Sequence, residues 1–455
     1  MQKLIVVILA AGQGTRMKSS MPKVLHTVGD RSMLEHSYDR AKELGADAIH
    51  IVYGHGGEQV KSALSHLDAN WVLQQQQNGT GHAVEAAMPA IEDGALVLVL
   101  YGDVPLVRVD TLKNLVSAAV ESGFGLLTAK LDNPTGYGRI IRDGDGVVKR
   151  IVEQKDGSAE ELKTNEVNTG MLAVDSSKLR HWINALDSDN AQGEFYLTDI
   201  IAMAANDGVV INTVQPTSID ETLGANNRVQ LAELERYLQQ RKANQLMIDG
   251  VTLRDPARID IRGELTAGID VIIDINCLFE GDVKLGSNVN IGANCTIRNS
   301  TLGDGATVMP NSIIEESQVG NRAMVGPFAR LRPETVLEEG AKIGNFVEVK
   351  KSTIGAGSKV SHLSYIGDTS MGKNVNIGAG TITCNYDGTN KHQTIIGDNV
   401  FVGSDSQLIA PVTLESGATI GAGTTLSDTA PQDSLTISRS RQKSVPGWSR
   451  PKKRS

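Results

Sequence analysis

The chain has 455 residues, a formal net charge of −9 and a hydrophobic fraction of 40%, with only 4% aromatic residues. This length allows two or three globular domains, and the scarcity of aromatic residues predicts cores of Val, Ile, Leu and Ala. No apolar stretch is long enough to span a membrane. The apolar N-terminal segment runs straight into a glycine loop, which indicates a buried strand and not a signal peptide. We therefore expect a cytoplasmic protein with no membrane partner.

Residues 1–228 predict an α/β domain. Residues 3–10 form a continuous apolar run typical of a buried strand. Further strand-like runs follow at 48–53, 70–73, 95–100 and 123–131. Helical patterns lie between them, as at 31–44 and 80–90. This alternation predicts a mostly parallel, Rossmann-like sheet with helices on both faces, in which chemistry takes place at the carboxyl ends of the strands.

The loop after the first strand carries Gly12 and Gly14, followed by Arg16 and Lys23. Glycines at this position let the backbone approach a polyphosphate closely and present N–H groups to it. The two basic side chains add positive charge. The spacing fits neither the dinucleotide fingerprint nor a P-loop, and by itself the loop is equally compatible with a tight turn.

Several segments, in order along the chain, together resemble the sugar-nucleotide pyrophosphorylase family. Residues 9–17 with Pro22-Lys23 resemble the signature that wraps the nucleoside triphosphate, and Gln74 with 79–81 resembles the segment that reads the uracil base. The resemblance implies a binding site for UTP and the UDP-sugar that is formed by Leu9, Ala10, Ala11, Gly12, Lys23, Gln74, Gly79, Thr80, Tyr101, Gly102, Asp103, Gly138, Glu153, Asn168 and Asn226.

Within this set, Gly138, Glu153 and Asn168 resemble the sugar-binding positions, and Asp103 and Asn226 resemble the two protein ligands of Mg²⁺. Each position also has an ordinary structural explanation, such as a turn at Asp103 or a helix cap at Asn226. A carboxylate and an amide leave most Mg²⁺ positions to water and phosphate oxygens, as that ion prefers.

The implied reaction needs these residue types. A sugar-1-phosphate oxygen attacks the α-phosphorus of UTP in line, and pyrophosphate leaves, so no protein nucleophile is required. Catalysis then rests on positioning and on neutralising charge. By resemblance, Lys23 and Arg16 contribute to this together with Mg²⁺ and backbone N–H groups.

Residues 229–249 predict a long linker helix without proline, which stops at Gly250. We expect it to act as a stiff spacer between the first domain and a second domain that covers residues 250–455.

The second domain follows a six-residue apolar period. Every sixth residue from Leu253 is apolar, and so is the set two positions on; the first set is Leu253, Ile259, Leu265, Val271, Cys277, Val283, Val289 and Cys295. This period predicts a parallel β-solenoid of hexapeptides, with roughly 18 residues per coil and about nine coils. A Gly-rich β-sandwich is the alternative, but it has no reason to keep one period for so long. The pattern resembles the left-handed parallel β-helix of hexapeptide-repeat acyltransferases, and the expected hand comes from this resemblance.

Cys277 and Cys295 lie eighteen positions apart, so they should stack in adjacent coils. That proximity would permit a disulfide. Buried free thiols are the better interpretation for a cytosolic protein, because cysteine packs well as a small apolar residue.

In each hexapeptide the neighbours of inward residues point outward. Glu348, Lys350 and Tyr365 are therefore expected on the outer surface, with His362 at a turn. Residues 383–391 interrupt the period and should protrude as a loop.

Residues 345–351, 362–365, 376–380 and 385–388 resemble the acetyltransferase half of the bifunctional bacterial N-acetylglucosamine-1-phosphate uridyltransferase / glucosamine-1-phosphate acetyltransferase family. The resemblance then covers essentially the whole chain. It implies His362 as the general base on the substrate amine, with Glu348 as its orienting partner. It places the sugar phosphate at Arg332, Lys350, Tyr365 and Asn376. It places acetyl-CoA at Ala379, Asn385, Tyr386, Ser404, Ala422 and Arg439.

The segment from Arg439 to Ser455 carries seven basic residues and no acidic one. A disordered tail or a nucleic-acid arm would have this composition. The phosphates of coenzyme A are a better partner here, and Trp448 could stack on the adenine. We expect no nucleic-acid partner.

The sequence as a whole predicts an enzyme with two sites, one for acetyl transfer to glucosamine-1-phosphate and one for uridylyl transfer to the product. By resemblance the solenoid forms a homotrimer, with coenzyme A sites between subunits. Two alternatives remain: a pyrophosphorylase whose solenoid only oligomerises or regulates, and a non-catalytic scaffold with both folds. His362 with the protruding loop argues against the first, and Asp103, Lys23 and His362 argue against the second.

Overall fold

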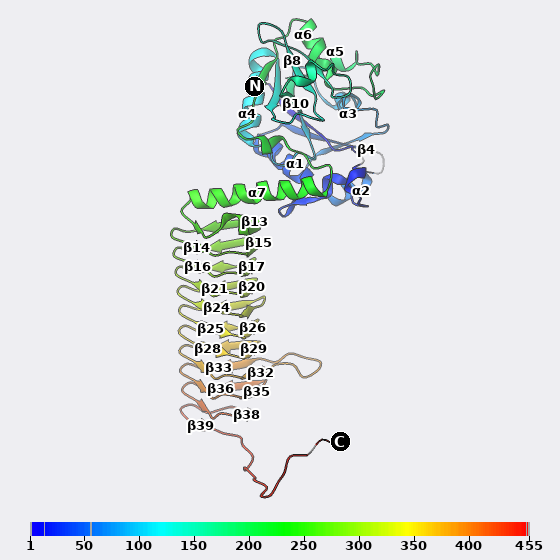
Figure 1. Ribbon diagram of the computed structural model, residues 1–455. Helices are drawn as coiled ribbons and strands as arrows, with labels where there is room; N and C mark the ends of the chain where they lie inside the picture. The colour runs from blue at the N-terminus through cyan, green and yellow to red at the C-terminus, as the bar shows by residue number, and fades with distance from the viewer. Residues whose placement is uncertain (1, 13, 55–56, 452, 454–455) are drawn as a thin grey trace. The chain divides into compact units, whose positions relative to one another are not determined.

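The computed structural model describes residues 2–12, 14–54, 57–451 and 453. The chain divides into two compact units, Met1–Leu238 and Gln239–Ser455. The first is an α/β unit and the second is a solenoid of short strands (Figure 1). The division falls within helix α7 (Arg228–Ile248), which covers the predicted linker.

The sheet of the first unit has the strand order β11-β7-β10-β6-β1-β4-β5. These strands are β1 (Leu4–Leu9), β4 (Ala48–Gly54), β5 (Asn70–Gln74), β6 (Leu96–Tyr101), β7 (Phe124–Lys130), β10 (Glu166–Asp175) and β11 (Asn212–Val214). The hairpin of β8 (Arg139–Arg142) and β9 (Val148–Val152) joins the sheet through β10. The sheet is mostly parallel as predicted, but β10 runs antiparallel to β6, β7 and β8, and β8 and β9 are antiparallel to each other.

Helices cover both faces of this sheet, as the sequence predicts. In β1, Ile5 and Val7 pack on the side of α3 (Thr80–Ala87), α5 (Ser176–Ile183) and α6 (Asp199–Asn206). Val6 and Ile8 pack on the side of α1 (Met33–Glu43), α2 (Glu58–Ala63) and α4 (Val109–Ser122). A strand with apolar residues on both sides forms because both faces are covered. The functional loops can therefore meet only at the ends of the strands.

The second unit contains two long parallel sheets. One consists of β12 (Thr252–Leu253), β14 (Ile272–Ile273), β16 (Asn290–Ile291), β19 (Thr307–Val308), β22 (Met324–Val325), β25 (Lys342–Asn345), β28 (Lys359–His362), β31 (Asn376–Ile377), β34 (Phe401–Val402), β37 (Thr419–Ile420) and β39 (Leu435–Thr436). The other consists of β13 (Ile259–Ala267), β15 (Cys277–Leu285), β17 (Thr296–Arg298), β18 (Thr301–Leu302), β20 (Ile313–Glu315), β21 (Ser317–Val319), β23 (Arg330–Leu331), β24 (Thr335–Leu337), β26 (Glu348–Lys350), β27 (Thr353–Ile354), β29 (Tyr365–Gly367), β30 (Thr369–Met371), β32 (Ile382–Cys384), β33 (Thr394–Ile396), β35 (Gln407–Ile409), β36 (Val412–Leu414) and β38 (Thr425–Leu426).

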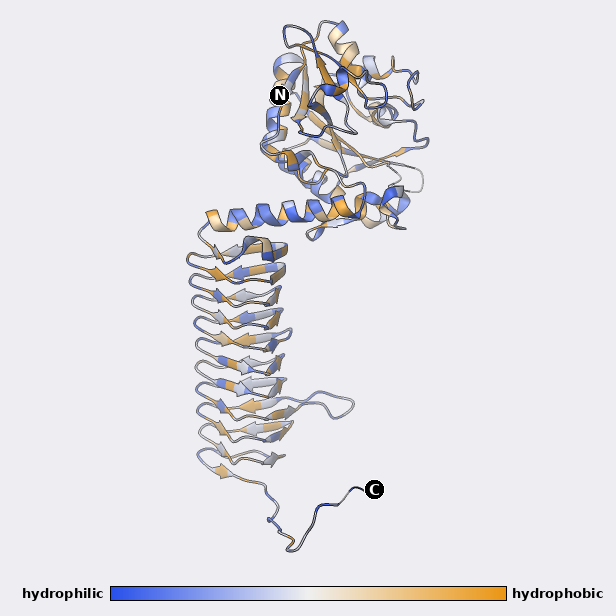
Figure 2. Ribbon diagram, in the orientation of Figure 1, coloured by the Kyte–Doolittle hydropathy of each residue, from blue (hydrophilic) through white to orange (hydrophobic). Residues whose placement is uncertain are grey.

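The six-residue period becomes the inward stack of this left-handed β-helix. Ile273 pairs with Ile291, and Ile291 with Val308, so successive coils are eighteen and seventeen residues long. All three side chains are buried, and apolar stretches recur from coil to coil (Figure 2). In its described part the first sheet has eleven strands, one per coil, where about nine coils were expected.

The cysteine and loop predictions are confirmed. Cys277 and Cys295 are buried free thiols, and burial raises the pKa of Cys277 to about 12. The segment between β32 and β33 protrudes from the coil (Figure 1). It also lengthens one coil, so that Ile377 pairs with Val402.

Helix α7 contributes apolar side chains to the cores of both units. Leu231, Leu234 and Leu238 pack on Met33 in the first unit. Further along, Ala243 belongs to the core of the second unit. The predicted domain limits at 228 and 250 therefore lie near the two ends of α7, whereas the division between the two units lies within this helix.

No helix in the described part of the chain combines the length and apolar character needed to cross a membrane.

Candidate functional site

Four predicted residues of the first unit meet at one point. The Lys23 ammonium forms an ion pair with the Asp103 carboxylate and donates to Asn226 Oδ1 at 2.7 Å. Arg16 Nη2 donates to the same Asn226 oxygen at 3.0 Å. Asp103 follows β6 and Asn226 precedes α7, so residues far apart in sequence converge at the carboxyl edge of the sheet.

Local backbone geometry explains the position of Lys23. Gly14 has a φ of +62°, and a Cβ built there would lie 2.5 Å from Lys23 Cβ. Only glycine combines this left-handed conformation with such a close approach. As a result Lys23 is only 9% exposed, and its ammonium is directed at Asp103 and Asn226. Gln13, which belongs to the same predicted motif, lies outside the described residues.

A pocket of about 500 Å³ opens beside this cluster. Ten predicted residues line it: Leu9, Ala10, Ala11, Gly12, Lys23, Gln74, Gly79, Thr80, Tyr101 and Asp103. Val24, Gln77, Ala83 and Glu194 also line it and were not predicted. Gln77 Nε2 donates to the Ala11 carbonyl oxygen. The run of four glutamines that begins at the last residue of β5, at the same edge of the sheet, was the available signal for Gln77.

The predicted sugar positions form a second group. Asn168 N donates to the Gly138 carbonyl oxygen at 2.9 Å, and Thr198 Oγ1 donates to Glu153 Oε1 at 3.2 Å. Burial raises the pKa of Glu153. Burial, with Asp103 and then Glu153, also raises the pKa of Tyr101, which links this group to the pocket.

The backbone of Gly102, directly after β6, is hydrogen-bonded to the end of β1. Its N–H donates to the Leu9 carbonyl oxygen at 2.9 Å, and no side chain would fit easily between Leu34 and Ala10. Gly102 therefore shapes the pocket without lining it.

The oxygen atoms of Asp103 and Asn226 fit a divalent cation. One ammonium, that of Lys23, is paired with both, so they are close enough to share one positive charge. No group of three or more His, Cys, Asp and Glu that could hold a metal occurs among the described residues. Two oxygen ligands with open positions suit Mg²⁺, which retains water and binds substrate phosphates.

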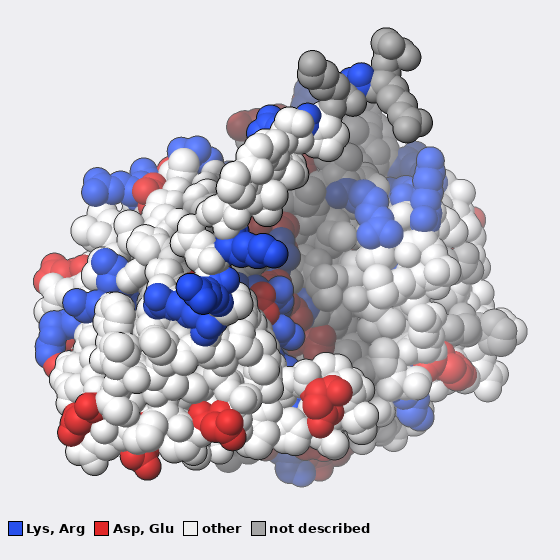
Figure 3. Space-filling view, turned by 90° about the horizontal axis from the view of Figure 1, so that it is seen from below, with Lys and Arg blue, Asp and Glu red and all other residues white. Residues whose placement is uncertain are grey.

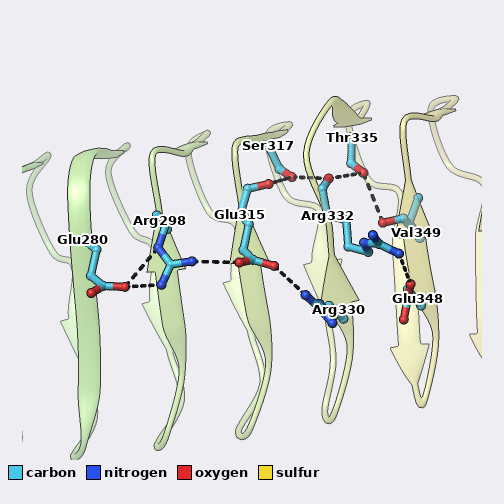
Figure 4. A network of polar contacts seen from close by, with 9 residues as sticks. All are labelled: Glu280, Arg298, Glu315, Ser317, Arg330, Arg332, Thr335, Glu348 and Val349. Atoms are coloured by element: carbon cyan, nitrogen blue, oxygen red, sulfur yellow. Dashed lines mark hydrogen bonds and ion pairs between the residues drawn. The ribbon is translucent and has the colours of Figure 1, made fainter.

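In the second unit, a ladder of charges runs along the face formed by β15, β17, β20, β23 and β26 (Figure 4). Arg298 bonds to Glu280 in one coil and to Glu315 in the next, at 2.9 Å for the latter. Glu280, Arg298 and Glu315 lie side by side in successive coils because they are register partners 18 and 17 residues apart. The ladder runs through the coils that lead to Arg332.

Arg332 is held from several sides. Its Nη1 donates to Glu348 Oε1 at 2.8 Å, and its carbonyl oxygen accepts from Ser317 at 3.2 Å and Thr335 at 2.7 Å (Figure 4). Hydrogen bonds therefore hold both the backbone carbonyl and the guanidinium of the predicted sugar-phosphate residue Arg332.

Beside Arg332 lies a group of cations. The Lys391 ammonium lowers the pKa of Lys350, and Arg332 adds to this effect. Adjacent like charges without a matching number of acids favour an anion. Lys391 was not predicted as a site residue. It is the last residue of the segment 383–391, which interrupts the six-residue period and was predicted to protrude. Tyr365 on β29 is the register partner of Glu348 on β26, the strand that also carries Lys350.

The structure places Asn345, and not the predicted orienting partner Glu348, beside the His362 ring. His362 Nδ1 lies 2.6 Å from Asn345 Oδ1, whereas Glu348 is paired with Arg332. His362 and Asn345 are register partners on β28 and β25, while Glu348 belongs to the other sheet. With Nδ1–H donating to Asn345, Nε2 carries the lone pair on the exposed ring. Asn376 lies on β31, the next strand after β28 in this sheet.

The predicted acetyl-CoA residues fall into two groups. Ala379, Ser404 and Ala422 stack at one corner, each accepting through its carbonyl oxygen from the next coil; Arg439 Nε donates to Ala422 at 2.9 Å. This corner precedes β32, β35 and β38.

Asn385 and Tyr386 lie in the protruding loop after β32, at the opposite end of that strand from Ala379. Asn385 is buried and donates to Asp368, while Tyr386 is 61% exposed. In one chain, the loop and the corner are therefore separated by the length of a strand.

After β39 the described residues form no helix or strand. The basic residues Arg439, Arg441, Lys443, Arg450 and Lys453 are all exposed. Figure 3, a view from below, shows Lys and Arg side chains in several separate groups, with Asp and Glu side chains between them. Lys452 and Arg454 lie outside the described residues.

Comparison with known proteins matches both halves. Residues 6–250 match the model of the MobA-like NTP transferase domain. Residues 261–340 match the GMPPB C-terminal domain, and residues 393–428 match the hexapeptide repeat of succinyl-transferase.

Full-length relatives are similar over the whole chain. The chain is 57% identical to the bifunctional protein GlmU of Marinobacter nauticus over 453 residues, which is 100% of both chains. It is 58% identical to that of Methylococcus capsulatus, covering 99% of this chain and 98% of the relative. It is 57% identical to that of Aromatoleum aromaticum, covering 99% of both.

Proposed function

The chain belongs to the GlmU family of bifunctional proteins, and from this premise we propose which residues carry each activity. The protein is an enzyme with acetyltransferase and uridyltransferase activities. It transfers the acetyl group of acetyl-CoA to glucosamine-1-phosphate, and it joins N-acetylglucosamine-1-phosphate to UTP with release of pyrophosphate. The single-activity and scaffold alternatives are thereby set aside.

We propose that uridylyl transfer takes place in the 500 Å³ pocket of the first unit. Gly12 and its neighbours hold the triphosphate, Gln74 and Gly79 hold the base, and Glu153 with Asn168 holds the sugar. Lys23 and Arg16 neutralise the charge that develops on the α-phosphate and the leaving pyrophosphate. Lys23 is buried, whereas Arg16 is exposed, and a cation that is already held in place costs little reorganisation during the reaction.

We also propose that Asp103 and Asn226 hold Mg²⁺. The ion would supply charge neutralisation at the phosphates. What supports this is the donor set, a carboxylate and an amide that already share one ammonium.

Acetyl transfer is proposed for the outer face of the solenoid around His362. Arg332, Lys350 and Tyr365 bind the sugar phosphate, and His362 Nε2 takes a proton from the amine as it attacks the thioester carbon. The proton passes from nitrogen to His362, the C–N bond forms, the C–S bond breaks, and the leaving thiolate takes up a proton so that coenzyme A is released as the free thiol. Asn345 in place of Glu348 fixes the imidazole for this step.

We propose that the enzyme is a homotrimer through the solenoid. Phe328, Phe346 and Leu363 occupy successive coils at one corner, are 50–60% exposed, and have φ near +50°. Bulky residues rarely adopt this conformation, so their presence at an exposed corner favours burial against another copy. They line a 410 Å³ pocket together with Glu348 and Tyr365, which would bring a neighbouring chain to the acetyl-transfer site. Within one chain, the loop with Asn385 and Tyr386 lies apart from the corner with Ala379. A second copy would contribute its own loop or corner and so complete the acetyl-CoA site.

A cytoplasmic location is proposed as well. Three free thiols, two of them buried, are what a reducing compartment permits.

The observation that carries the proposal is the pairing of Lys23 with both Asp103 and Asn226, far from His362 in the sequence and in a separate unit. Two assays on one preparation test it. Acetyl-CoA with glucosamine-1-phosphate should release free thiol, and UTP with N-acetylglucosamine-1-phosphate should release pyrophosphate. A preparation that releases only one of the two contradicts the proposal.

A further inference from the structure

Asn226 is the point at which the polar cluster of the first unit is anchored. Its side-chain oxygen accepts from both Arg16 and Lys23. Its direction depends on the peptide that carries it. That peptide lies between a loop and the start of a long helix, and both sides are fixed by hydrogen bonds.

The helix side is fixed by a modified capping box. Asn227 is the residue before α7, and its Oδ1 accepts from Gln230 N at 3.0 Å, as an N-cap does. In a standard capping box the third helical side chain would bond back to the N–H of the cap. Here Gln230 Oε1 instead accepts from the N–H of Asn226, one residue earlier, at 2.7 Å.

The loop side is fixed by the segment that carries the other proposed metal ligand. Ala225 N donates to the Asp103 carbonyl oxygen at 3.3 Å. Ala225 is fully buried and packs in one cluster with Met33 and Leu234. The peptide of Asn226 is therefore held between Asp103 on one side and the first turn of α7 on the other.

From these contacts we propose that Gln230 is a positioning residue for uridylyl transfer. By accepting from the Asn226 N–H, it fixes the direction in which the Asn226 amide oxygen faces Lys23, Arg16 and the proposed Mg²⁺ position. Gln230 touches none of the reacting atoms. The inference rests on the proposed metal site and adds to it a residue that sequence motifs do not mark.

Two substitutions of Gln230 distinguish the effect of its hydrogen-bond acceptor from the effect of its side-chain size. Gln230→Met keeps the length and removes the acceptor oxygen. Gln230→Glu keeps an acceptor at the same place. One hydrogen bond corresponds to a fold-change of about five to ten. We expect Gln230→Met to weaken Mn²⁺ binding, followed by electron paramagnetic resonance without turnover, by about that factor. Gln230→Glu should bind Mn²⁺ within about twofold of the parent.

Kinetics give a second readout. In Gln230→Met, the Mg²⁺ concentration that gives half-maximal uridylyl transfer should rise, while KM for N-acetylglucosamine-1-phosphate and thiol release remain unchanged. Gln240→Met is the matched control, because Gln240 lies on the same helix, is exposed and donates to Asn244 further along that helix. It should leave Mn²⁺ binding and both activities at parent values.

The inference is overturned if Gln230→Met binds Mn²⁺ like the parent, or if Gln230→Met and Gln230→Glu lose affinity equally, because the acceptor would then be irrelevant. Asp103→Asn is measured alongside. If Asp103→Asn also binds Mn²⁺ like the parent, the proposed metal site itself has failed. If only Asp103→Asn loses binding, the site stands and the role of Gln230 does not.

Discussion

The Lys23 ammonium lies between the Asp103 carboxylate and the Asn226 amide oxygen, and so it is paired with both oxygens that we propose for Mg²⁺. A metal cation at those oxygens must compete with Lys23 for them. Once Lys23 yields them, its ammonium is available to the triphosphate in the adjoining pocket. The lysine and the metal site are thus linked by charge, and this link can be measured.

Lys23→Met removes the ammonium and keeps the length of the side chain. Mn²⁺ binding to the free protein should become about tenfold tighter, because a charged hydrogen-bond partner no longer competes. Uridylyl transfer should fall by about 10²–10³-fold, as when one charge-stabilising donor is lost. Lys18→Met, an exposed lysine in the same loop, should change neither property. Unchanged Mn²⁺ affinity in Lys23→Met would show that the two cations do not compete.

His362→Ala should reduce acetyl transfer by about 10²–10⁴-fold, the usual value of general-base catalysis. KM for glucosamine-1-phosphate should change far less, because Arg332 and Lys350 remain. Raising the pH should partly restore the rate, since more of the substrate amine is then unprotonated. Asn345→Ala should cost about five- to tenfold through loss of one hydrogen bond to the ring, whereas Glu348→Gln should not mimic it. Acetyl transfer at the parent rate in His362→Ala would exclude His362 as the base.

Two N-terminal fragments test the role of α7. The fragment 1–228 lacks Leu234, which is 1% exposed and packs on Met33. Loss of such a side chain from a core costs about 2–5 kcal/mol, so this fragment should unfold at lower denaturant and lose uridylyl transfer. The fragment 1–250 should retain uridylyl transfer. Both fragments should sediment as monomers, because both lack the solenoid. A fully active 1–228 fragment, or a trimeric fragment of either length, would refute this.

The first unit should become less stable on acidification. His50 in β4 is 2% exposed, its Nδ1 has no hydrogen-bond partner among the described residues, and burial lowers its pKa. The unfolded chain, with an ordinary histidine pKa of about 6.5, then takes up a proton before the folded chain does. The contribution of His50 to stability is therefore full above this pH and is lost as the pH falls from about 6.5 toward the lower folded pKa.

Urea unfolding followed by Trp fluorescence at pH 7 and pH 5 measures this loss. In His50→Asn the free energy of unfolding should change less between the two pH values than in the parent. His181→Asn, at an exposed histidine of the same unit, should follow the parent curve. Equal pH dependence in His50→Asn and the parent would contradict the assignment.

Periodicity predicted most of the fold. The alternation of strands and helices and the six-residue apolar beat are local signals, and both became the observed cores. Strand β10 was not anticipated. It contains Asn168-Thr169-Gly170, which has the composition of a turn, and the strand accommodates these residues in an irregularity between Asn168 and Leu172. Such an irregularity depends on tertiary pairing, which local composition does not report.

The same distinction applies to the candidate sites. Residues in motifs, such as Gly12 and Lys23, were predicted. Residues brought in by register were not. Asn345 meets His362 because one coil is seventeen residues long at that point. Lys391 reaches Lys350 because a loop protrudes, and Gln77 reaches Ala11 because two strand ends are neighbours. These contacts are set by the fold and not by spacing within a motif.

The most direct test of the account is a crossed comparison of Asp103→Asn and His362→Ala in the full-length protein, with both activities measured for each. Asp103→Asn should remove most pyrophosphate release from UTP and N-acetylglucosamine-1-phosphate and leave thiol release from acetyl-CoA and glucosamine-1-phosphate at the parent rate. His362→Ala should do the reverse. If either variant loses both activities while its folding is intact, or if neither loses its own, the assignment of two independent sites in two units is contradicted.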